Sequence, residues 1–109
     1  MGDQDIYRKI GKLLVDAGPE DAREIIVRAR IFSEGDGGRY EFDYVNQLGE
    51  LNWFDPDGHV VGNLTELLVH LREYFLEKNL TRGEKSWVEC EIKFNVHEMK
   101  LGVELKYEN

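Results

Sequence analysis

Two carboxylates, Glu41 and Asp43, stand two residues apart in the segment 39–44, which reads RYEFDY. Alternate residues of an extended strand face the same side, so these carboxylates are expected to lie roughly 7 Å apart. Such a pair can supply a general acid and a general base, as in glycoside hydrolysis, where a deep pocket raises one pKa. A chain of 109 residues offers little room for that pocket. We therefore expect no enzymatic activity.

The other reactive residue types form no recognisable site. The three histidines are not spaced as zinc ligands. Asp55, Asp57 and Gly58 resemble the start of a calcium loop, but Pro56 interrupts that pattern and indicates a tight turn. Cys90 stands between two acids in a strand-like segment, which favours a buried structural thiol over a nucleophile. We expect no metal site and no cofactor.

The charge of the chain is concentrated in one segment. The net charge is −8, and residues 33–66 hold eight acids and one base, whereas the rest of the chain is near neutral. Such acidity disfavours nucleic acid and anionic membranes as partners. The chain has a single cysteine, no apolar run of the roughly 20 residues that a membrane helix needs, and a start unlike a signal peptide. We expect a cytoplasmic protein.

Residue periodicity predicts two helices and five strands in one domain spanning residues 1–109. The second helix is expected to begin at Asn63, because Asn63 and Glu66 match a capping box. The order α-β-β-β-α-β-β predicts an α+β two-layer sandwich, an antiparallel five-stranded sheet with both helices on one face. The expected elements are helix 3–17, strands 24–32, 39–44 and 51–54, helix 63–79, and strands 88–94 and 101–107.

The acids of RYEFDY have two interpretations. If the turn at residues 33–38 closes its hairpin symmetrically, Arg30 faces Glu41 and Arg28 faces Asp43. Opposite charges directly across a strand pair contribute roughly 0.2–1 kcal/mol each, so both acids would be neutralised locally. The other interpretation is that they belong to a surface that binds a basic protein.

The second interpretation is favoured by acids that have no evident partner in the sequence and that are expected in turns on the rim of the same sheet, namely Glu34, Asp36, Glu50, Asp55 and Asp57. Acidic turns around an open sheet face attract and orient a basic protein. Aromatic residues ringed by charge are typical of interface hot spots. Here we expect Trp53 to pack in the core and Phe54, on the alternate side, to be exposed. The candidate contact residues are Glu34, Asp36, Glu41, Asp43, Glu50, Phe54, Asp55 and Asp57.

Several packing motifs resemble one known family. They are the opening Ile6-Tyr7-Arg8-Lys9-Ile10, the break Gly18-Pro19-Glu20-Asp21, the alternation Tyr40-x-Phe42-x-Tyr44, and the ending Trp87-x-x-x-x-Ile92-x-Phe94 followed by Leu101-x-Val103-x-Leu105-x-Tyr107-Glu108. Over nearly its full length the chain resembles the YezG-like family of immunity proteins, antitoxins that accompany secreted polymorphic toxins of bacteria. One departure is the last hairpin turn, which reads His97-Glu98 where the resemblance leads us to expect Asp-Gly.

The resemblance implies a function without catalysis. An immunity protein binds the C-terminal domain of its cognate toxin, commonly a nuclease, and blocks it. Nuclease toxins carry basic surfaces, so an acidic inhibitor is physically sensible. Two other classes stay open. A small acidic secretion chaperone would dimerise and hold an extended segment of an effector, and a DNA mimic would bind unrelated basic proteins. We expect a monomer rather than a dimer.

Overall fold

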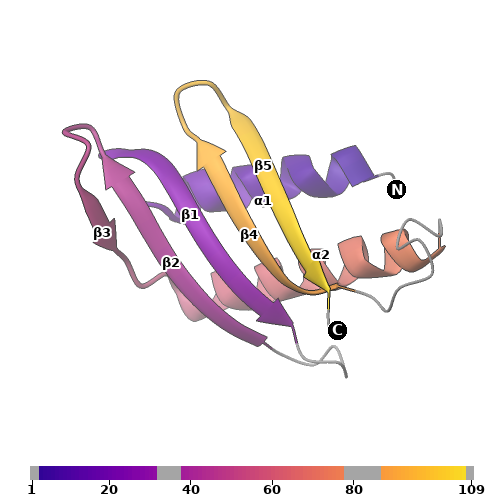
Figure 1. Cartoon of the computed structure of the whole chain (residues 1–109). Helices are drawn as coiled ribbons and strands as arrows, with labels where there is room; N and C mark the ends of the chain where they lie inside the picture. The colour runs from indigo at the N-terminus through magenta and orange to yellow at the C-terminus, as the bar shows by residue number, and fades with distance from the viewer. Residues whose placement is uncertain (1–2, 32–37, 78–86, 108–109) are drawn as a thin grey trace.

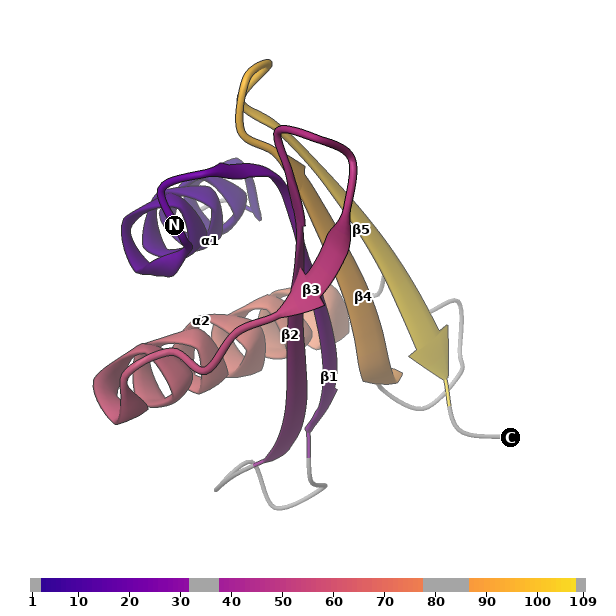
Figure 2. The ribbon, with the colours of Figure 1, turned by 90° about the vertical axis from the view of Figure 1, so that its left-hand side faces the viewer.

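The protein folds into two layers, a sheet and a pair of helices. The computed structural model describes residues 3–31, 38–77 and 87–107. The sheet stands in front of both helices in Figure 1, and Figure 2 shows it edge-on with both helices on the same side. One face of the sheet is therefore covered by both helices, and the other, here called the open face, carries no helix in the part of the chain that the structure describes.

The predicted fold class is confirmed. All five strands are antiparallel to their neighbours and lie in the order β3-β2-β1-β4-β5. The chain order is α-β-β-β-α-β-β, as the periodicity predicted. The elements are α1 (Asp3–Ala17), β1 (Ala22–Ile31), β2 (Gly38–Asn46), β3 (Leu51–Trp53), α2 (Gly58–Glu77), β4 (Trp87–Asn95) and β5 (Lys100–Tyr107).

The core lies between the helices and the covered face of the sheet. Helix α1 buries residues at positions i, i+4 and i+8, and the alternate residues of β1 and β4 point toward it. Edge strand β5 adds half-buried aliphatic side chains to the same layer. The fully buried large side chains are Ile6, Ile10, Leu14, Ile25, Val27, Ile31, Leu64, Leu68, Leu71 and Ile92.

Helix α2 begins at Gly58, and the predicted start at Asn63 is wrong. Val60 lies four residues before buried Leu64 and is itself 5% exposed, so the apolar stripe of the helix extends one turn further back. The Val60 N–H donates to the carbonyl of Asp57 at 2.9 Å, which forms the first turn. The capping-box pattern at Asn63 is therefore inside the helix.

The register of the β1–β2 hairpin differs from the prediction by two residues. Arg30 is paired with Arg39, and Arg28 is paired with Glu41. A slip of two residues keeps every side chain on its face, so the hydrophobic pattern alone could not exclude it. Gly38 shows why the chain pairs this way: a Cβ there would lie 2.5 Å from the carbonyl oxygen of Arg30, so only glycine permits this approach.

Candidate protein interface

The open face carries a balanced set of charges among the described residues. Residues paired across neighbouring strands share a side of the sheet, so the register identifies the members of this face. Six acids and six bases lie on it, and they contribute no net charge. They are Glu24, Glu41, Asp43, Glu89, Glu91 and Glu104 with Arg28, Arg30, Arg39, Lys93, Lys100 and Lys106.

Arg28 is the centre of the largest ion-pair network on this face. Its Nη1 donates to Asp43 Oδ2 at 2.9 Å, and its Nε donates to Glu91 Oε2 at 3.2 Å. Lys93 adds a pair with Glu91 at 3.6 Å. The hydrogen bond to Asp43 is the main cause that raises the pKa of Arg28, with further contributions from Glu91. One guanidinium thus ties β2, β1 and β4 together.

The two acids of RYEFDY have different surroundings. Asp43 is hydrogen-bonded to Arg28, and its side chain is 22% exposed. The Glu41 side chain is 74% exposed and reaches Arg28 only at 3.7 Å. The expected contact of Glu41 with Arg30 is wrong, because the register places Arg30 opposite Arg39 and it binds Glu89 instead. The charge of Asp43 is therefore neutralised locally by Arg28, as the first interpretation expects. The Glu41 carboxylate stays largely exposed and can contact a partner protein.

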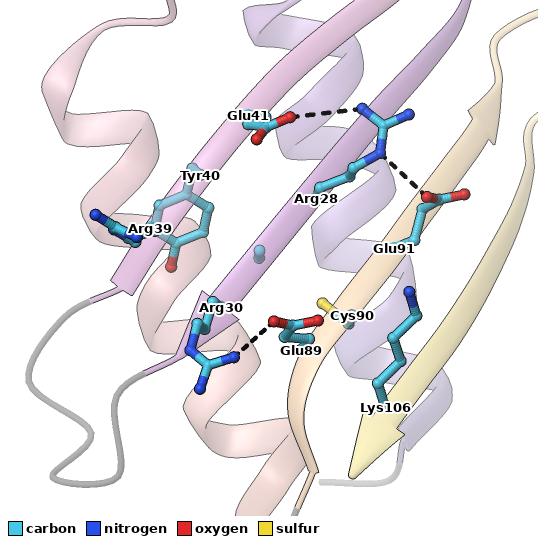
Figure 3. Close-up of a pocket in the computed structure, with 10 residues that line it drawn as sticks. Arg28, Arg30, Arg39, Tyr40, Glu41, Glu89, Cys90, Glu91 and Lys106 are labelled. Atoms are coloured by element: carbon cyan, nitrogen blue, oxygen red, sulfur yellow. Dashed lines mark hydrogen bonds and ion pairs between the residues drawn. The ribbon is translucent and has the colours of Figure 1, made fainter. Parts of the chain in front are cut away.

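Side chains on the open face are sorted into rows that cross the strands. One, here called the acidic row, contains Glu41, Arg28, Glu91 and Glu104. The next, here called the basic row, contains Arg39, Arg30, Glu89 and Lys106. The members of both rows except Glu104 line a hollow of ≈ 550 Å³, and Figure 3 shows the side chains that surround it. The face is thus neutral in sum, but the basic row has an excess of positive charge and the acidic row next to it has an excess of negative charge.

Two large apolar side chains lie at one edge of the open face, on edge strand β3. Trp53 is paired with Asp43 and is 73% exposed, and Leu51 is paired with Val45 and is 64% exposed. Trp53 and Leu51 are here called the aromatic corner. Because they stand two residues apart on one strand, they present one continuous apolar surface next to the Arg28 network.

The expectation for the two aromatic residues at this edge is reversed by the structure. Phe54 is half-buried, and its ring lies 5.6 Å from that of Phe42 and 5.9 Å from that of Tyr44. Its N–H donates to the Phe42 carbonyl at 3.0 Å. Phe54 is therefore a packing residue, and Trp53, expected in the core, is the exposed one.

Glu50, predicted as an unpaired acid, is held in the turn between β2 and β3. Its Oε1 accepts a hydrogen bond from the Asn46 side-chain amide at 3.0 Å, and its N–H donates to Asn46 Oδ1 at 2.9 Å. Gly49 takes a φ of +84° in this turn, a conformation that favours glycine. Glu50 thus has a structural role, although its side chain is exposed.

The remaining predicted acids do not join the open face. Asp55 and Asp57 lie on the link between β3 and α2, where with Asp16 of α1 they line a separate hollow on the helix side. Their placement on the rim of the open face is therefore wrong, because the link leaves the sheet to reach α2. Glu34 and Asp36 lie outside the described residues.

No metal-binding cluster of three or more His, Cys, Asp or Glu side chains occurs in the described ranges 3–31, 38–77 and 87–107. Likewise, no described helix combines the length and apolar composition needed to cross a membrane. Cys90 is 3% exposed on the covered side of β4, and burial raises the pKa of its thiol to about 12. A thiol in that state supplies almost no thiolate near neutral pH.

Cys90 should therefore resist alkylation in the folded protein. At mildly alkaline pH we expect iodoacetamide to leave native Cys90 unmodified, because the reactive thiolate is both disfavoured and inaccessible. In guanidinium chloride the same residue should react completely, which mass spectrometry would detect. Modification of the native protein at the rate of the unfolded chain would contradict this placement.

Sequence reasoning missed the aromatic corner and the basic row. Strand alternation does place Leu51 and Trp53 on one side and Phe54 on the other, but it cannot say which side is covered. The aromatic run of β2 was the available signal, because the rings of Phe42 and Tyr44 accommodate Phe54. No sequence signal places Arg30 opposite Arg39, since that depends on the register.

Neither a scan against protein-family models nor a search of curated proteins returns a match to this chain.

Proposed function

We propose that this chain is an immunity protein, which binds the C-terminal domain of a cognate toxin in the cytoplasm and blocks it stoichiometrically. The observation that carries the proposal is the exposed aromatic corner beside a network of paired charges. The proposed activity is inhibition by binding, and it requires neither catalysis nor a cofactor.

The aromatic corner has the properties of a binding hot spot. A tryptophan buries a large apolar area when a partner covers it, and tryptophan and arginine are enriched among residues that dominate binding energy. Trp53 lies beside Asp43, which Arg28 holds in place. Side chains already fixed by hydrogen bonds lose little further freedom on binding, which favours affinity.

The acidic character of the chain supports a basic partner. The net charge of −8 attracts a positively charged domain over a distance, and exposed Glu41 together with Asp55 and Asp57 contributes to that field. A nuclease domain has the basic surface that this attraction requires. Because Asp55 and Asp57 lie on the helix side, their proposed role is steering rather than contact at the aromatic corner.

A secretion chaperone is the other candidate, and it differs in oligomeric state. A chaperone of this kind would form a dimer that grips an extended segment, whereas the immunity protein proposed here is a monomer that binds a folded domain. Light scattering on the isolated chain and on its complex would distinguish the two. A stable dimer bound to an unfolded segment would favour the chaperone.

The proposal predicts a stoichiometric inhibitory complex. The test begins with the neighbouring upstream gene, which the proposal expects to encode a secreted protein, and uses the C-terminal domain of that protein. We expect the two chains to co-elute one to one, and the toxin's nuclease activity to fall to zero at equimolar inhibitor. The rate of association should decrease steeply with salt, because exposed charges are screened over roughly 8–10 Å near physiological ionic strength. Full toxin activity in the presence of excess inhibitor would contradict the proposal.

A further inference from the structure

The basic row contains two arginines that face each other without an intervening acid. Arg30 and Arg39 are directly paired across β1 and β2. Like charges at directly opposite positions of an antiparallel pair are destabilising. Figure 3 shows the two guanidinium groups turned apart: Arg30 points toward Glu89, and Arg39 extends past the outer edge of β2, away from Arg30. The two guanidinium groups therefore do not share one acid, and Arg39 is left exposed at the edge of the hollow.

The basic row has three cationic side chains and one acid, Glu89, which forms an ion pair with only one of them. Arg30 Nη1 donates to Glu89 Oε1 at 2.6 Å. Among the described residues, neither Arg39 nor Lys106 makes an ion pair. The row thus presents two positive charges without an ion pair, Arg39 and Lys106, in the lining of the ≈ 550 Å³ hollow, in a chain whose net charge is −8. Arginine side chains arranged in this way bind carboxylate and phosphate oxygens.

The neighbouring acidic row favours a carboxylate over a phosphate as the anion bound at the basic row. It lies two residues further along each strand, at a spacing of roughly 7 Å, and Glu41, Glu91 and Glu104 outnumber Arg28 there. A nucleic acid that placed one phosphate at the basic row would bring further phosphates against these carboxylates. A protein segment can instead place an acid at the first row and a base at the second.

We propose that the basic row binds a carboxylate of the protein partner, and that the same partner segment places a basic side chain at the acidic row. The aromatic corner lies on the far side of the acidic row from the basic row. The partner surface is therefore apolar, basic and acidic in that order, with successive groups roughly 7 Å apart. This inference rests on the proposed function and specifies the chemistry of the toxin surface that is bound.

The test compares two charge reversals that have equal effects on net charge. Arg39→Glu and Lys9→Glu each make the chain more acidic by two units, and both residues are exposed without an ion pair among the described residues. Lys9 lies on α1, and this helix belongs to the layer on the other side of the sheet from the open face. Binding of the upstream-encoded toxin domain would be measured by calorimetry, and thermal melting would confirm that both variants fold.

We expect Arg39→Glu to weaken binding about tenfold or more, because it brings a carboxylate against the partner's carboxylate, and Arg39→Gln to weaken it less. Lys9→Glu should bind as tightly as the wild type or slightly more tightly. Equal affinities of the two reversals would overturn the carboxylate proposal and leave the immunity function standing. No complex with wild-type protein would overturn both. Binding of a short single-stranded RNA that Arg39→Glu abolishes would assign the row to phosphate and also overturn the proposal.

Discussion

Replacing Trp53 by alanine is expected to weaken binding of the toxin domain by about 2–4 kcal/mol, roughly 30-fold to 1,000-fold in Kd. Trp53 is 73% exposed in the free chain, so the substitution removes little folding stability. The loss therefore appears almost entirely in the complex, where the indole ring would be covered. Calorimetric titration of wild-type and variant chains measures it, and urea unfolding of the free variant checks that stability is unchanged.

The matched control for Trp53 is an exposed apolar side chain elsewhere. Leu76 of α2 is 50% exposed and lies on the layer opposite the open face. Leu76→Ala should leave the affinity unchanged. If the two substitutions weaken binding equally, or if Trp53→Ala has no effect, the aromatic corner is not the contact surface.

Replacing Leu68 by alanine should destabilise the free protein by roughly 2–5 kcal/mol. Leu68 is fully buried in the core between α2 and the sheet, so its truncation removes apolar contacts and leaves a cavity. Because domains of this size have a free energy of unfolding of roughly 5–15 kcal/mol, this is a large fraction of the total. Urea titration measures the change.

Leu76 again provides the comparison, because it has the same side chain on the same helix but is half exposed. Leu76→Ala should cost less than about 1 kcal/mol, since little of its surface is removed from water on folding. A loss below 1 kcal/mol for Leu68→Ala would mean that α2 does not dock on the sheet as described.

The fold could be predicted from the sequence because each element carries a strong period. The helical stripe of α1 and the alternation in β1 are set by residues that the core buries, and both appear in the structure with almost unchanged bounds. The start of α2 was harder to predict, because Asn63 has a capping pattern inside the helix. Burial of Val60 against the rest of the core outweighed that local signal.

The candidate site could be predicted only in part, because cross-strand pairing determines it. The sequence identified Glu41 and Asp43 as side chains of one exposed face. It could not identify Glu91 and Glu89 as the partners of Arg28 and Arg30, since β4 lies about 60 residues away in the chain. β1 and β4 are neighbours in the sheet although they are far apart in the sequence. Their contacts depend on the order of the strands in the sheet, and local periodicity does not determine that order.

The acidic segment of residues 33–66 illustrates the same limit. Its acids are close in sequence, but those that the structure describes are distributed between the open face, the β2–β3 turn and the helix side. Local density of charge therefore did not indicate one surface. A surface is indicated instead by the order of the basic row, the acidic row and the aromatic corner along the open face.

The most direct test of the central claim is fluorine NMR on Trp53 during complex formation. A chain labelled with 5-fluorotryptophan and carrying Trp87→Phe has a single resonance, which reports on the exposed indole of Trp53. With increasing unlabelled toxin domain, we predict that this resonance shifts and saturates at one equivalent, and that it loses its sensitivity to the solvent isotope. A complex that forms while the Trp53 resonance keeps its position and its solvent sensitivity would contradict binding through the open face.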